Sequence, residues 1–266
     1  MNSKPLLPGV NPYERMRYHV IGPHSSFYRA LRLLKSLKRD VTIPHVLGFG
    51  CFWSSTDQVV DPSMNFNGPP NARRRVSVVT LASSNGRVLV IRLLNILQLQ
   101  KKSIACRRFL KTLKKLLAST NVPKVGFALK RDATFIMDDY KNENFEHQFR
   151  LNGFLENSIF KKIENLSHQS IDYFANLIFG VRFNTEISRN DWEATGKYLI
   201  PDLVAHAAKD ATLAIQVFKY YVHKMFPPDV LNELNGRKLC RKIGGAEFIG
   251  RYRIKNFAPQ TPRGPT

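Results

Sequence analysis

The chain has 266 residues, of which 43% are hydrophobic, and it carries 41 Lys and Arg against 20 Asp and Glu. This length and apolar content allow one large domain with terminal extensions and a packed core. No apolar run reaches the ~20 residues that cross a bilayer, and the first ten residues lack the charged-then-apolar pattern of a secretory signal. We therefore expect an intracellular protein of the nucleus or cytoplasm, with no membrane partner.

The positive charge is the strongest feature of the composition. A net charge of +21 predicts a polyanionic partner, most often nucleic acid, and the alternative is a merely solvated basic surface. Residues 62–131 contain no Asp or Glu at all. The three cysteines, Cys51, Cys106 and Cys240, are odd in number and far apart, so we expect neither a disulfide framework nor a cysteine metal site.

The first half of the chain predicts a helix followed by three strands. Residues 1–42 contain several prolines and one amphipathic helix at 27–38 with a basic outer side, so we expect a basic N-terminal extension. Apolar runs at 46–53, 76–82 and 87–91 predict strands. Asn85-Gly86 between the last two runs is a hairpin signal, which makes the three strands antiparallel.

A second amphipathic helix is predicted at residues 104–118. Its outer side is basic and has no acid for pairing, which is typical of an anion-binding surface. The strand expected at 122–129 runs into two further basic residues. The candidate nucleic-acid-binding residues are Arg107, Arg108, Lys111, Lys114, Lys115, Lys130 and Arg131.

The remaining pattern alternates helices and strands. We expect a short helix at 134–140, a strand at 151–160, and helices at 167–179 and 201–223. Residues 226–266 form a basic C-terminal tail. The fold class is therefore α/β, a mixed sheet with three antiparallel strands and then alternating helices and strands, flanked by helices.

The first predicted strand contains Gly48-Phe49-Gly50-Cys51-Phe52-Trp53. This stretch resembles the opening strand of the RNase D and Werner-type 3'-5' exonucleases, whose pattern is Gly-Phe-Asp-x-Glu-Trp. Gly50 stands where the family has its aspartate, and Phe52 stands where it has its glutamate. The resemblance implies a ribonuclease-H-like fold over residues 43–225.

Later motifs of that family follow in order. Residues 124–132 resemble its second motif, and Asp132 matches the aspartate. Residues 201–211 resemble its third motif, in which Asp210 matches the aspartate and His206 occupies the slot of the catalytic tyrosine. Further matches are Ser170 to Ala175 and Ser188 to Trp192.

The resemblance implies phosphodiester cleavage with two divalent ions held by four carboxylates. Here Asp132 and Asp210 are the remnant catalytic and metal-binding positions, and two carboxylates hold one Mg²⁺ or Mn²⁺ weakly at best. His206 could orient water in principle, although a packing role is the stronger interpretation. We expect no required cofactor, with Mg²⁺ or Mn²⁺ relevant only to residual activity.

These observations lead to three hypotheses. The first is an exonuclease-like protein that binds nucleic acid, RNA slightly favoured over DNA, and is catalytically impaired or inactive. The second is an active metal-dependent 3'-5' exonuclease with an altered site. The third is a protein-protein adaptor built on a nuclease fold, in which the basic surfaces bind acidic proteins.

Overall fold

The computed structural model describes residues 6–7, 9–39, 46–55, 73–99, 103–140, 153–157, 160, 170–184, 187, 192 and 199–226. Within this part of the chain, six strands form one mixed sheet in the order β1-β4-β3-β2-β5-β6. The strands are β1 (Arg17–Ile21), β2 (Leu47–Ser55), β3 (Arg73–Ala82), β4 (Arg87–Ile91), β5 (Lys124–Gly126) and β6 (Phe154–Glu156).

The centre of the sheet is the antiparallel set that the sequence predicts. β2 pairs with β3 and β3 pairs with β4, both antiparallel, while β1, β5 and β6 join by parallel pairing. The turn between β3 and β4 ends at Gly86, whose φ of 82° suits glycine. Ser83 N–H donates to Arg87 O, and Gly86 N–H donates to Ser83 O, which closes this hairpin tightly.

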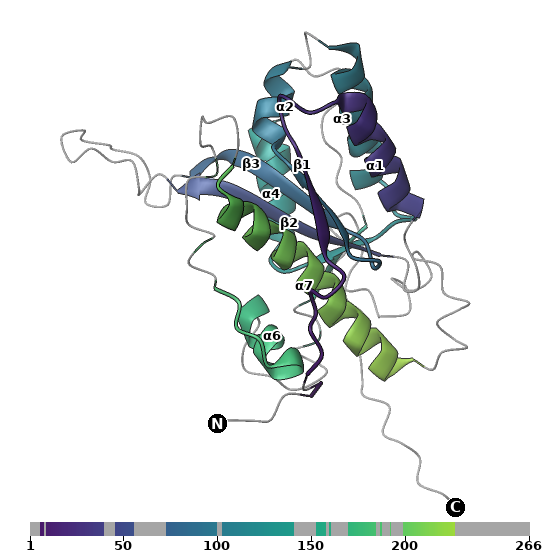
Figure 1. The fold of residues 1–266 in the computed structure, drawn as a ribbon, viewed down its shortest axis with the longest axis vertical. Helices are drawn as coiled ribbons and strands as arrows, with labels where there is room; N and C mark the ends of the chain where they lie inside the picture. Colours follow the sequence, from purple (N-terminus) through teal and green to yellow (C-terminus); the bar gives the residue numbers. More distant parts are fainter. Residues whose placement is uncertain are drawn as a thin grey trace, which may run out of the picture.

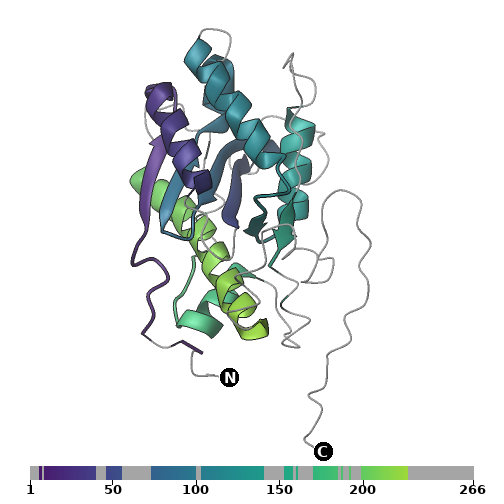
Figure 2. The same ribbon diagram turned by 90° about the vertical axis from the view of Figure 1, so that its right-hand side faces the viewer.

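Helices cover both faces of the sheet. They are α1 (Phe27–Arg39), α2 (Leu93–Leu99), α3 (Ile104–Leu117), α4 (Leu129–Asp139), α6 (Ile171–Phe179) and α7 (Pro201–Met225). Figure 1 shows α7 crossing one face of the sheet, with α6 beside it, and α1 and α3 lying next to each other on the other side. Figure 2 shows the same molecule from the side of α1, α3 and α4.

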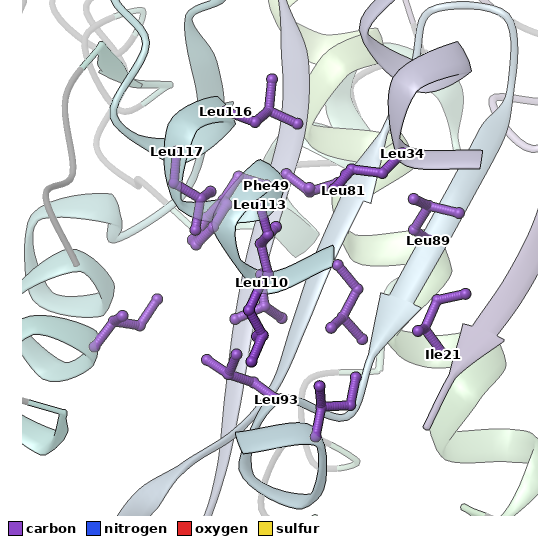
Figure 3. Close-up of a cluster of buried hydrophobic side chains, with 14 of the residues drawn as sticks. Ile21, Leu34, Phe49, Leu81, Leu89, Leu93, Leu110, Leu113, Leu116 and Leu117 are labelled. Carbon is purple, nitrogen blue, oxygen red and sulfur yellow. The ribbon is translucent and has the colours of Figure 1, made fainter. Parts of the chain in front are cut away.

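The core beneath α1, α3 and α4 is aliphatic. Leu34 of α1 and Leu110 and Leu113 of α3 are fully or nearly fully buried against Phe49 of β2 and Leu81 of β3 (Figure 3). Phe27 of α1 and Phe109 of α3 also meet, with ring centroids 6.1 Å apart. This packing holds α1 and α3 together as one layer.

The opposite face of the sheet receives α7, and β2 comes very close to it. A Cβ placed on Gly48 would lie only 1.9 Å from the backbone oxygen of Ala211. Ala207 and Ala208 are buried on the same side of the helix, where small side chains allow this approach. Because successive residues of a strand face opposite sides, Gly50 and Phe52 also point toward α7.

The α/β fold class predicted from the sequence is confirmed, but several element bounds differ. The strand expected at 122–129 is wrong in extent, because it ends at Gly126. The helix expected from residue 134 begins at Leu129. The reason is Ala128, whose φ of 57° is left-handed and cannot continue a strand.

Other differences lie nearer the ends of the chain. The sequence pattern missed β1, in which only Ile21 is buried, and it missed α2. Residues 17–39, expected to belong to an extension, contribute β1 and α1 to the same sheet and core. The expected strand 151–160 shortens to β6, and α6 starts after a Ser170 cap. The tail from residue 227 onward, with Cys240, lies outside the described residues.

The contact of β2 with α7 generates a prediction. Gly48→Ala should destabilise the fold by about 3 kcal/mol or more, because the clash is with backbone that cannot rotate away. Gly50→Ala is the matched control and should cost about 1 kcal/mol, since its neighbours are side-chain oxygens that can turn. Urea unfolding of both variants measures this difference, and equal losses would contradict the close-approach explanation.

Candidate functional site

The site is formed where β2, α4 and α7 meet. Gly50 of β2 faces Asp210 of α7, and a Cβ built on Gly50 would lie 2.3 Å from Asp210 Oδ2. The same Cβ would lie 2.7 Å from the hydroxyl of Thr80, which pairs with Gly50 across β3 and has no hydrogen-bond partner among the described residues. The carboxylate of Asp210 therefore occupies the space beside the strand where a side chain at position 50 would begin.

An aromatic cluster fills the neighbouring position. The ring of Phe52 stacks on Trp192, with centroids 4.3 Å apart, and Trp192 is fully buried. His206 meets the Phe52 ring edge-on at 5.9 Å and lies 4.7 Å from the ring of Phe183. An ionised carboxylate at position 52 would thus be surrounded by apolar rings, which is costly without a bound cation.

His206 belongs to this cluster and not to a water-filled pocket. The residue is only 5% exposed. Burial, assisted by the charge of Lys209, lowers the pKa of His206 to about 4. The imidazole is consequently neutral at physiological pH, and its described neighbours are the aromatic rings of Phe52, Phe183 and Trp192.

Asp132 lies in the first turn of α4 and is 4% exposed. Within the described segments its Oδ1 makes no hydrogen bond, although Arg131 Nε lies 3.5 Å from it at ion-pair distance. Burial raises the pKa of Asp132 well above its usual value, and the charges of Asp210 and Glu156 raise it further, while Arg131 opposes them. Burial therefore favours the protonated form of Asp132.

Glu156 is a structural residue of the site that the sequence reasoning missed. Its two carboxylate oxygens accept hydrogen bonds from the backbone N–H groups of Ala128 and Leu129, at 3.0 Å and 2.6 Å. These two hydrogen bonds hold the left-handed backbone of Ala128 and cap the start of α4. The signal that could have pointed to Glu156 is its position in the sheet. Glu156 pairs with Gly126 where the parallel strands β5 and β6 end at the same edge.

The second remnant acid, Asp210, also has a raised pKa. Burial raises the pKa of Asp210 to about 7, which brings its titration close to neutral pH. Within the described residues, no group of three or more His, Cys, Asp or Glu is placed to hold a metal ion. With Gly50 and Phe52 contributing no ligand and Glu156 bound to backbone, the two-ion arrangement does not fit this site.

The predicted basic residues fall into two places. Lys130 and Arg131 are exposed beside Asp132 on α4, and the Arg131 guanidinium lies 5.1 Å from the ring centre of Trp53. The α3 residues lie in the layer on the opposite face of the sheet from α7, which carries Asp210. They are Arg107, Arg108, Lys111, Lys114 and Lys115. The structure therefore does not group these α3 residues with Asp210 on one face of the sheet.

Comparison with known proteins gives the class first. The structure resembles the catalytic core of RRP6 from Trypanosoma brucei, with a TM-score of 0.53 and 10% sequence identity, covering 91% of this chain and 56% of that one. The chain thus spans little more than half of the RRP6 core, and at this identity the likeness shows a shared fold alone. An EXD2 exonuclease domain soaked in Mn matches at a TM-score of 0.39 and 20% identity, over 89% of this chain and 100% of that one.

The family follows from the sequence itself. The family model described as 3'-5' exonuclease matches residues 71–225, more than half of the chain. The chain belongs to this 3'-5' exonuclease domain family, as its motifs indicated. The match includes Asp132, His206 and Asp210 but begins after the strand that carries Gly50 and Phe52. No curated protein matches the chain, and no helix in its described segments is both long and apolar enough to span a membrane.

The raised pKa of Asp210 generates a stability prediction. A folded-state pKa of about 7 lies above the ordinary value of 3.8, so stability from the protonated carboxyl is complete below about pH 4 and is lost as pH rises through 7. Asp210→Asn should therefore gain about 2 kcal/mol relative to the parent protein between pH 4 and 8. The gain is smaller than full burial would give, because Asp210 is partly exposed and solvent screens its charge.

Urea unfolding across this pH range measures the gain. The exposed Asp202→Asn on the same helix is the control, and its stability relative to the parent protein should change little over the same range. If both variants gained the same stability over this pH range, the assignment of the pH dependence to Asp210 would be contradicted.

The aromatic setting of His206 predicts the opposite pH dependence. Because its folded pKa of about 4 lies below the ordinary 6.5, the stability it contributes is present above 6.5 and is lost as pH falls toward 4. His206→Phe should keep the packing and gain about 1 to 2 kcal/mol over the parent protein on going from pH 7.5 to 5. Thermal unfolding at both pH values tests this, with the exposed His223→Gln as control. A variant that is equally destabilised at both values would show that the imidazole is not buried as a neutral group.

Proposed function

We propose that this protein is a nuclease-fold domain that binds the end of a nucleic-acid strand and does not cleave it efficiently. The observation that carries the proposal is the filled site at β2. Gly50 supplies no ligand and its flank is taken by Asp210, while Phe52 is stacked on Trp192. Two of the four carboxylates that would hold two divalent ions are missing.

The charge of the site supports binding without metal. Burial raises the pKa values of Asp132 and Asp210, which lessens the negative charge that opposes an approaching phosphate. Lys130 and Arg131 are exposed beside Asp132. Exposed cations favour phosphate contacts, which position a strand without reading its sequence. RNA is slightly preferred over DNA on the resemblance alone, and we propose the nucleus or cytoplasm as the location.

An active exonuclease with an altered site is the second candidate. It is favoured by one observation, namely that Asp132 and Asp210 are both present and close enough for their charges to interact. In that case one Mg²⁺ or Mn²⁺ bound by these two carboxylates would support slow cleavage. No contact among the described residues favours the protein-protein adaptor over the two nuclease-like candidates. Nucleic-acid binding assays distinguish the adaptor from them.

The decisive experiment measures cleavage and binding on the same substrate. We expect a 3'-labelled single-stranded RNA to be bound at low salt and to remain intact in Mn²⁺ or Mg²⁺. Lys130→Gln/Arg131→Gln should weaken binding about tenfold and reduce the slope of log affinity against log salt by about 1.4, because each phosphate contact with a single strand contributes about 0.7. Metal-dependent loss of 3' nucleotides that disappears in Asp210→Ala would establish the active exonuclease instead.

A gain-of-ligand variant tests the cause of the deficit. Gly50→Asp/Phe52→Glu restores the missing carboxylates, and we expect it to bind Mn²⁺ in calorimetry where the parent protein binds weakly or not at all. Gly50→Asp alone, which leaves the Phe52 ring in place, is the matched control. Equal Mn²⁺ binding by the parent protein and the double variant would mean that unforeseen ligands already complete the site.

A further inference from the structure

The surface of α1 and α3 is the strongest charged feature that the strand-end site does not use. The two helices pack side by side through Phe27 and Phe109 and bury their apolar sides in the same core (Figure 2). Their outer sides carry ten basic residues and the two helices contain no acid. These residues, here called the α1/α3 basic face, are Arg29, Arg32, Lys35, Lys38, Arg39, Arg107, Arg108, Lys111, Lys114 and Lys115.

Helix electrostatics alone do not explain this charge. Lys38 and Arg39 in the last turn of α1 complement the negative end of the helix dipole. Arg29 and Arg107 lie in first turns, where a cation is unfavourable. Like charges three or four residues apart, such as Arg32 beside Lys35, also repel by a few tenths of a kcal/mol per pair. The face therefore keeps an internal repulsion that a bound polyanion would relieve.

The α1/α3 basic face is separate from the strand-end site. The residues of the strand-end site come from β2, α4 and α7, and none comes from α1 or α3. Asp210 and the Phe52 cluster lie on the α7 side of the sheet, while α4, which carries Asp132, Lys130 and Arg131, shares the core of α1 and α3 on the other side. The side chains of β2 alternate between the two, with Phe49 in the core under α1 and α3 and Phe52 in the core under α7. The cations of α1 and α3 are therefore not among the residues of the strand-end site, and they can meet another part of the ligand.

We propose that the α1/α3 basic face binds the phosphate backbone of a double-helical segment of nucleic acid, as a second surface distinct from the strand-end site. This inference rests on the proposed nucleic-acid-binding function and adds the form of the ligand. Phosphates of a duplex are regularly spaced and need only rigidly held cations, which two packed helices supply.

The exposed side chains favour a duplex over two other polyanions. Single strands are bound by stacking bases on aromatic side chains, but Tyr28, 64% exposed, is the one exposed aromatic side chain on α1 and α3. A membrane-binding helix needs an exposed apolar side to insert, and the apolar sides of α1 and α3 are buried in the core. Apart from Tyr28, the exposed large apolar residue on these helices is Ile104.

The test uses two probes of the same sequence, a duplex on the order of 20 base pairs and the matching single strand with a free 3' end, each made as RNA and as DNA. Arg32→Gln/Lys35→Gln/Lys111→Gln removes three charges from the α1/α3 basic face while glutamine preserves helix propensity. We expect duplex affinity to fall about tenfold or more and its salt slope to fall by about 2 to 3, with single-strand binding changed much less.

Two control variants make the result interpretable. Arg15→Gln/Arg182→Gln/Lys224→Gln removes three exposed charges that lie off α1 and α3, and it should retain duplex affinity within about threefold. Lys130→Gln/Arg131→Gln should show the reverse pattern, losing single-strand binding and keeping duplex binding. Circular dichroism and thermal unfolding establish that all variants are folded.

The outcomes separate this inference from the proposed function. If the face variant binds duplex as the parent protein does, or no more weakly than the charge-matched control, the duplex surface is overturned. If the parent protein binds single strands but not duplexes, this inference fails while strand-end binding stands. If it binds neither, and instead binds vesicles containing anionic lipid, both fail. Loss of duplex binding in the face variant alone supports the assignment.

Discussion

The close approach of α7 to β2 is the constraint on which the site depends. Gly48 has no side chain, so the backbone of Ala211 lies where a Cβ would otherwise be. The continued contact along β2 then brings Asp210 against Gly50 and His206 against Phe52. With the helix this close, a change at either strand position alters the contacts of the helix directly. The two departures from the family pattern, Gly50 and Phe52, are therefore directly linked to the packing of α7 on β2.

The electrostatics of the remnant carboxylates follow from the same packing. In a site that holds two divalent ions, the cations keep buried carboxylates ionised. Without four ligands, burial is the largest cause of the raised pKa values of Asp132 and Asp210, and it favours their protonated forms. The site therefore carries less negative charge than four ionised carboxylates would give it. That change is what makes direct phosphate contact by Lys130 and Arg131 reasonable without metal.

The sequence predicted what its periodicity and motifs encode. Apolar runs located β2, β3 and β4, and the order of the motifs singled out Asp132 and Asp210. It could not reveal β1, because only Ile21 of that strand is buried and its pairing with β4 depends on distant residues. It also could not reveal Glu156, whose role comes from the parallel pairing of β5 and β6. Local patterns fail where a position is defined by its partner across the sheet.

The separation of α1 and α3 from α7 bears on how such a protein could lose cleavage and keep binding. The cores on the two sides of the sheet share β2 but use alternate residues of it, so replacement at Gly50 and Phe52 leaves Phe49 and the packing beneath α3 unaffected. Cations on α1 and α3 are consequently independent of the chemistry on the α7 side. On the proposed function, nucleic-acid binding by cations on rigid helices would survive the loss of metal ligands, whereas binding through a bound metal ion would be lost with them.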